Sequence, residues 1–139
     1  MTTIRNLTLS ALVLLLAAGL PGCRKQSQTA KSNIEGHWTG FDLARPAEKL
    51  QLTITGDQLE YHGAQADDWC RGTFVLNETT QPAQMDLVIK EPPQAVATLL
   101  VIYELQGDEI KVARADPGKP RPADFTPSKQ VKVLSFKRD

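Results

Sequence analysis

Apolar and polar residues alternate with a period of two along most of the chain beyond residue 33. This period is typical of a β-strand that packs one face on a core and turns the other to solvent. The segment 97–106 is apolar in both phases, which predicts a strand whose outer face is partly covered as well. Eight strands are therefore expected, within 33–41, 49–55, 58–63, 72–77, 84–90, 97–106, 109–115 and 130–138.

Turn-forming residues separate these segments. Gly107 and Asp108 lie between two of them, which predicts a hairpin because glycine and aspartate tolerate the positive φ that tight turns require. The segment 115–129 contains four prolines and cannot be a central strand, so it is expected to form a long loop or lid. Short antiparallel strands in this number predict an all-β fold, a small eight-stranded barrel or a sandwich. We favour the barrel, because closure leaves no exposed edge strand.

The alternation also predicts which side chains face inward. These side chains are bulky and numerous for so short a chain, which favours a filled interior over a cavity for a ligand. The inward-facing candidates are Leu50, Leu52, Ile54, Phe74, Leu76, Leu87, Ile89, Val101, Tyr103 and Val112.

The N-terminal part has a different composition. Arg5 precedes an apolar run of 14 residues, 7–20, which is shorter than the roughly 20 residues that a membrane-spanning helix needs. This pattern predicts a secretion signal, and the lipobox resemblance described next implies that it covers residues 1–22. Ten polar residues without periodicity, 24–33, predict a flexible tether, and the folded domain is expected at 34–139.

The sequence LPGC, residues 20–23, resembles the lipobox of bacterial lipoproteins. That resemblance implies cleavage after Gly22, diacylation of the Cys23 sulfur and acylation of the new amine, because stable anchoring takes more than one lipid chain. By analogy it implies a cell-envelope protein that faces the periplasm, on the outer membrane rather than the inner one. The alternative is an ordinary secretion signal cut near 17–19. If Cys23 is lipidated, Cys70 has no disulfide partner, since the chain has two cysteines.

Charge and composition exclude one class of partner. The chain has 16 basic and 16 acidic residues, a formal net charge of zero, with 41% hydrophobic residues. A nucleic-acid-binding protein usually has a clearly basic face, so no nucleic-acid partner is expected.

One polar cluster could carry chemistry. It contains His62, Asp67, Asp68 and Cys70, and either His62 or the distant His37 could activate the thiol as a nucleophile. The cluster lacks the paired spacing of a structural zinc site and resembles no known nucleophile motif. A packing role for Cys70 is favoured, and neither catalysis, a metal nor a cofactor is expected.

The second half of the chain resembles a lipocalin-like domain family that is common in planctomycetal bacteria and uncharacterised in function. The resemblance covers about residues 34–138 and is looser over 41–71, where this chain is shorter. It implies a barrel closed at one end by Gly36 and Trp38, with Arg138 packed over the Trp38 ring in a cation–π contact. Tyr103, Arg121 and Phe125 are candidates for ligand contact or for the lid. For Arg121 and Phe125 a structural role is favoured, in which Arg121 donates to loop carbonyls and Phe125 inserts under the loop. The matching residues are Gly72, Thr73, Pro82, Asp86, Ile102 to Leu105, Gly107, Asp108, Gly118, Lys119, Arg121, Pro122, Phe125, Lys137 and Arg138.

Two functions remain open from the sequence. The first is an anchored envelope module with a structural or protein-interaction role. The alternative is a carrier or sensor that binds a small apolar ligand inside the barrel.

Overall fold

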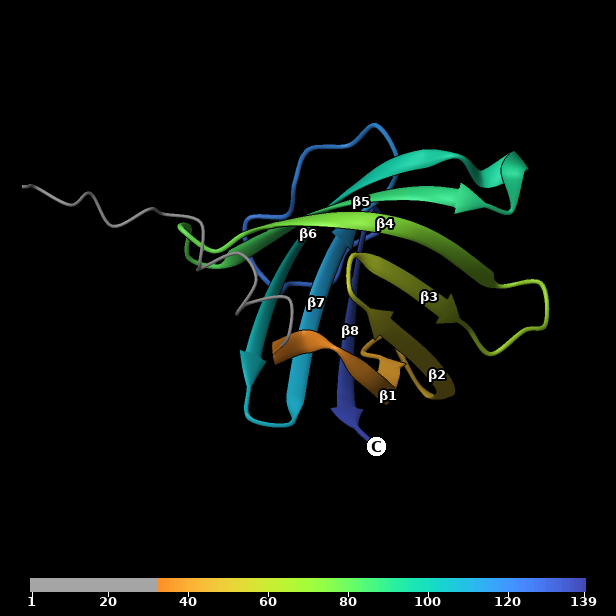
Figure 1. Cartoon of the computed structure of the whole chain (residues 1–139), viewed down its shortest axis with the longest axis horizontal. Coiled ribbons are helices and arrows are strands. Elements are labelled where there is room, and N and C mark those ends of the chain that lie inside the picture. Colours follow the sequence, from red (N-terminus) through yellow and green to blue (C-terminus); the bar gives the residue numbers. More distant parts are fainter. Residues whose placement is uncertain (1–32) are drawn as a thin grey trace, which may run out of the picture.

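The computed structural model describes residues 33–139. Eight antiparallel strands pair in chain order, and β1 pairs with β8 to close the barrel (Figure 1). The predicted all-β barrel is therefore confirmed, whereas the expected signal peptide, Cys23 and most of the tether lie outside the described residues. The elements are β1 (Gly36–Asp42), β2 (Arg45–Thr55), β3 (Gln58–His62), β4 (Trp69–Asn77), β5 (Ala83–Glu91), the 3₁₀ turn η1 (Pro93–Ala95), β6 (Ala97–Gln106), β7 (Glu109–Ala115) and β8 (Val131–Arg138).

Two strands begin earlier than the alternation predicted. β2 begins at Arg45, which pairs with Asp42 across the β1–β2 turn. β4 begins at Trp69, which pairs with His62 on β3. Backbone pairing with a neighbouring strand sets these ends, and the local pattern of apolar residues does not reveal it.

The β6–β7 hairpin forms where the sequence predicted it, but its turn needs only one residue with positive φ. Gly107 has a φ of 60°, while no residue other than glycine has a positive φ among residues 33–139. The expectation that Asp108 would share this conformation is therefore wrong, because the single glycine supplies the reversal.

The inner face of the barrel forms the main core. All ten predicted inward-facing residues belong to this core or pack against it. A second, smaller cluster on the outer face contains Ile102, Ala113 and Val133, and Phe125 of the β7–β8 connection packs against it. The prediction that β6 is covered on both faces is thus confirmed.

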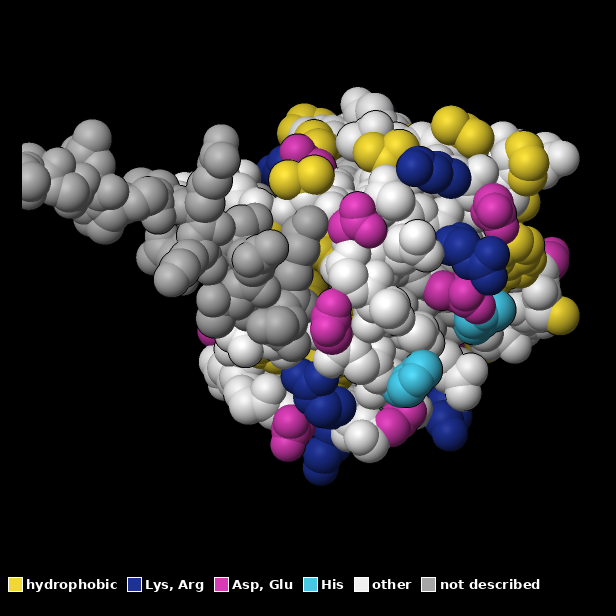
Figure 2. All heavy atoms as spheres, in the orientation of Figure 1, with side chains coloured by type: hydrophobic (Ala, Val, Ile, Leu, Met, Phe, Trp, Pro, Cys, Tyr) yellow, Lys and Arg dark blue, Asp and Glu magenta, His cyan; other side chains and the backbone are white. Residues whose placement is uncertain are grey.

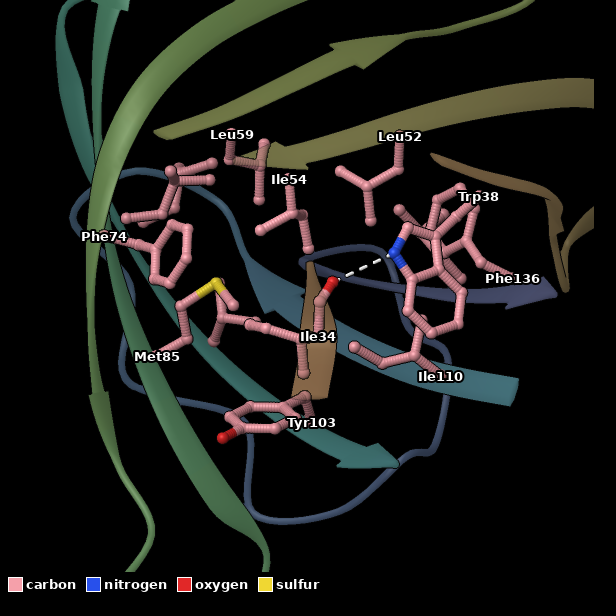
Figure 3. Close-up of a cluster of buried hydrophobic side chains, with 14 of the residues drawn as sticks. Ile34, Trp38, Leu52, Ile54, Leu59, Phe74, Met85, Tyr103, Ile110 and Phe136 are labelled. Carbon is pink, nitrogen blue, oxygen red and sulfur yellow. Dashed lines mark hydrogen bonds between the residues drawn. The ribbon is translucent and has the colours of Figure 1, made fainter. Parts of the chain in front are cut away.

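One end of the barrel is closed by residues from both ends of the described chain. Trp38 is 1% exposed, and its indole N–H donates to the carbonyl oxygen of Ile34 at 3.0 Å (Figure 3). The Arg138 guanidinium lies 4.1 Å from the centre of the Trp38 ring, as expected for the predicted cation–π contact. Arg138 also donates to the carbonyl oxygens of Asn33, at 2.7 Å, and Glu35.

Gly36 makes this closure possible. Its φ is 137°, and a Cβ atom there would lie 2.9 Å from an Arg138 guanidinium nitrogen. A larger residue would therefore meet both backbone strain and the guanidinium that covers Trp38.

The connections alternate between the two ends of the barrel. The turns after β2, β4 and β6 lie at the closed end, with Trp38. The connections after β1, β3, β5 and β7 lie at the opposite end. The eight strands close into a barrel within residues 33–139 and surround the main core. This part of the chain therefore contains the entire barrel.

Candidate ligand-binding cavity

The barrel interior contains a cavity of about 450 Å³ that opens at the end opposite to Trp38. Its deeper walls are apolar and come from six strands. Its mouth is bordered by the connections that follow β3, β5 and β7. The walls are lined by Leu52, Ile54, Leu59, Met85, Leu87, Ile89, Leu99, Val101, Ile110, Val112, Leu134 and Phe136. The residues toward the mouth include Tyr61, Asp67, Asp68, Cys70, Ala97, Arg114, Asp116 and Pro117.

The expectation of a filled interior is therefore wrong. Bulky side chains do fill the closed half, where Ile34, Trp38 and Ile110 are each 1% exposed. In the open half some inward side chains are short, as at Cys70 and Ala97. β4 also has a bulge between Arg71 and Gly72, which bends the strand at this level.

Polar groups line the mouth from two parts of the barrel wall, β3–β4 and β7. Tyr61 and Cys70 are paired across β3 and β4 and both line the cavity. The Tyr61 hydroxyl lies 3.5 Å from a carboxylate oxygen of Asp68. Arg114 on β7 lines the same cavity, and its guanidinium lies 3.8 Å from the carboxylate of Asp116.

Burial further disfavours ionisation of the Tyr61 hydroxyl and the Cys70 thiol. It raises the pKa of Tyr61 to about 12, and the negative charge of Asp68 adds to the rise, while Arg114 opposes it. Burial likewise raises the pKa of the Cys70 thiol, and again Arg114 opposes the rise. At neutral pH, Tyr61 is therefore a hydrogen-bond donor at the cavity and Cys70 is a thiol with little nucleophilic character.

The cluster predicted from the sequence is divided between two faces of the barrel. The ring of His62 lies outside, with Nε2 2.7 Å from a carboxylate oxygen of Glu60, and stacks at 6.4 Å on Trp69. The hydrogen bonds of His62 and Arg71 lower the pKa of Glu60. His62 therefore does not serve Cys70 as a base. Within residues 33–139, no group of three or more His, Cys, Asp or Glu side chains is placed to hold a metal ion.

The residues proposed for ligand contact or the lid lie away from this cavity. Arg121 donates to the carbonyl oxygens of Met85, at 3.2 Å, and Val101, at 2.8 Å, and pairs with the carboxylate of Asp86. It thereby fastens the β7–β8 connection across β5 and β6 rather than to the carbonyls of its own loop. Of that long connection, Asp116 and Pro117 reach the mouth.

Tyr103 and Phe125 border a different hollow, on the outside near the closed end, with a volume of about 560 Å³. Tyr103 is 3% exposed and donates its hydroxyl to Glu78 at 2.8 Å. Burial and this carboxylate raise the pKa of Tyr103, so its hydroxyl is satisfied by a structural contact. None of the three lid candidates lines the barrel cavity.

Sequence reasoning missed Arg114, although a signal was present. In the segment 109–115 the inward phase contains Ile110 and Val112, and the next residue in that phase is Arg114. A charged residue at a position where the alternation expects an apolar inward side chain is unusual in a barrel interior. Such a departure from the pattern indicates a candidate site residue.

Comparisons of this chain with family models, with curated proteins and with solved structures found no match. The resemblance to the lipocalin-like family therefore stays a prediction. Among the described residues no helix is long and apolar enough to cross a membrane. On the face seen in Figure 2, basic and acidic side chains are interspersed.

Proposed function

We propose that the barrel binds one small, mostly apolar ligand in its interior, as a carrier or sensor held at the bacterial cell envelope through Cys23. The observation that carries the proposal is the cavity of about 450 Å³, whose deeper walls are apolar and which opens at one end. Ligand pockets typically enclose about 300–1,000 Å³, with mostly apolar walls and a few polar groups that fix orientation.

The size of the cavity limits the ligand. An engineered apolar cavity of about 150 Å³ in another protein binds benzene, which has six heavy atoms. In proportion, the volume in this barrel suits a ligand on the order of 18 heavy atoms. Burial of each methylene contributes about 0.8 kcal/mol, so affinity should rise about fourfold per added carbon until the cavity is full. A structural or protein-interaction module has weaker support. That function was favoured by the expectation of a filled interior, and the barrel contains a cavity instead.

The position of the mouth is compatible with an anchor. The described chain begins at the closed end, where Asn33 and Glu35 are bound by Arg138. A tether that leaves from this end would keep the opposite end, with the cavity, accessible to a ligand.

Native mass spectrometry of the full chain, purified from the cells that make it, tests the binding proposal. The detergent should differ in mass from any natural amphiphile. We expect one small molecule per chain, released by organic extraction. The variant Ala97→Trp, purified in the same way, serves as the matched control and should lack this adduct. A spectrum of the ligand-free chain alone, from cells in all growth phases, would count against a carrier.

Location is tested separately by the variant Cys23→Ser. We expect the native chain in the membrane fraction, with a mass increased by its lipid, and the variant without lipid and without the cut after Gly22. A variant that remains membrane-bound and fully processed would show that Cys23 is not the anchor, and would leave the binding proposal untouched.

A further inference from the structure

Arg114 occupies an inward position of the barrel. The residues before it in the same phase of β7 are Ile110, which is 1% exposed, and Val112, which packs against the main core. The alternate residues of β7, Ala113 and Ala115, are fully buried away from the cavity. Arg114 itself lines the cavity, and its side chain is 26% exposed.

The guanidinium of Arg114 is poorly satisfied by the protein. Its side chain forms no hydrogen bond within residues 33–139, and its one ion pair, to Asp116, spans 3.8 Å. Charge-assisted hydrogen bonds between such groups are usually about 2.7–2.9 Å long. An arginine has five N–H donors in a planar fork that matches a carboxylate, so most of its binding capacity is unused at the edge of an apolar cavity.

Two further groups at the open end of the barrel favour an anion. The Tyr61 hydroxyl is a neutral donor whose contact with Asp68, at 3.5 Å, is long for a hydrogen bond. Lys132 on β8 is paired with Arg114 and is half-buried. It lies on the same face of its strand as the buried Leu134, two residues further along. A second cation thus stands beside Arg114 at this end of the barrel.

Acidic residues at the mouth would instead favour a ligand with a positively charged end group. Asp67 and Asp68 are exposed in the connection after β3, and the Asp116 side chain is 44% exposed. Exposed charges interact in a medium close to water and are screened beyond about 8 Å at physiological salt. Asp42, at the end of β1, is 3% exposed, but its carboxylate already accepts from the Ala44 backbone N–H at 2.9 Å and pairs with Arg45 at 3.5 Å. Among the charged residues that line the cavity, Arg114 is the most buried, so its interaction with a bound group is the strongest one.

We propose that the ligand is an amphiphile with one anionic end group, a carboxylate, that Arg114 and Tyr61 bind at the mouth while the apolar chain fills the cavity. This inference rests on the proposed ligand-binding function and adds the chemistry of the end group. On binding, the carboxylate replaces Asp116 as the partner of Arg114, and Asp116 turns to solvent.

Isothermal titration calorimetry with three probes of equal chain length tests this. The probes are tetradecanoic acid, tetradecanol and tetradecylamine, each below its aggregation concentration. The protein is the chain 23–139 with Cys23→Ser, which contains the entire barrel and needs no detergent. We expect the acid to bind about 10- to 100-fold more tightly than the alcohol, the range for a hydrogen-bonded charge. Arg114→Met should bring the acid to the affinity of the alcohol and leave the alcohol unchanged.

Lys111→Met is the matched control, because it removes a cation from an exposed outward position of the same strand. It should change neither affinity. Equal affinity for acid and alcohol, or tightest binding of the amine, would overturn the anionic end group and leave the binding function standing. Failure of all three probes to bind would instead contradict the binding function itself, and the inference with it.

Discussion

Replacement of Trp38 by alanine is expected to lower the free energy of unfolding by about 3–5 kcal/mol, the usual cost of removing a buried Trp or Phe side chain. Trp38 is 1% exposed and fills the closed end of the barrel. Its loss also leaves the Ile34 carbonyl without the indole N–H and the Arg138 guanidinium without the ring beneath it. Since small domains are stable by only about 5–15 kcal/mol, this one change should bring the barrel close to unfolding.

The matched control is the same substitution at Trp69, the second tryptophan of the chain. Trp69 is half-buried at the open end, and its ring stacks on the exposed His62. Trp69→Ala should cost about 1 kcal/mol, the centre of the range for single substitutions. Urea unfolding followed by far-UV circular dichroism measures both variants without relying on tryptophan fluorescence. Equal costs for the two variants would show that Trp38 does not hold the closed end.

The cation–π contact between Trp38 and Arg138 accounts for part of the stability lost in Trp38→Ala. A cation–π contact contributes about 0.5–2 kcal/mol, depending on how much water is excluded from it. Arg138 is also bound to the carbonyl oxygens of Asn33 and Glu35, so it ties the start of the described chain to its end. The closed end is therefore a small network, and the effects of substitutions within it should not add.

The strands were predictable because each has a simple local signal. Leu50, Leu52 and Ile54 alternate with polar residues, and all three face the core of the barrel. The covered outer face of β6 could be predicted for the same reason, since Ile102 is apolar where a solvent-facing strand residue would be polar. Period-two patterns report on which face is buried, and the ten inward residues that they predicted in β2, β4, β5, β6 and β7 all belong to the core or pack against it.

The cavity could not be predicted in this way. Alternation tells which side chains face inward, but whether they meet at the centre depends on barrel closure, strand tilt and the local bend at the β4 bulge. These properties arise from pairing between strands distant in sequence. The predicted inward-facing residues were identified correctly, but their total number does not show how they are distributed along the barrel. The closed half is crowded, whereas the open half is lined by small residues such as Cys70 and Ala97.

The long proline-rich connection shows the same limit. Its sequence excludes a strand, but does not say which surface it covers. The structure packs Phe125 on the outer cluster and uses Arg121 to bind β5 and β6, so most of the connection braces the outside of the barrel. The expected lid is reduced to Asp116 and Pro117 at the mouth.

Ala97→Trp is expected to abolish ligand binding while the barrel stays folded. Ala97 lies in β6 opposite Ile89, and both residues line the cavity. An indole at position 97 would enter the open half and take the place of the ligand's apolar chain. Because each excluded methylene costs about 0.8 kcal/mol, displacing four of them would weaken binding of tetradecanoic acid by more than 100-fold.

Thr98→Trp provides the control on the adjacent residue. Thr98 is exposed on the outer face of β6, so the same indole there stays outside the barrel and should leave the affinity unchanged. Calorimetry gives the affinities, and urea unfolding should show that Ala97→Trp is at least as stable as the parent, since filling a cavity commonly stabilises a protein. Unchanged binding by a stable Ala97→Trp barrel would place the ligand somewhere other than the interior. Loss of binding in both variants would instead indicate a site on the outer surface of β6.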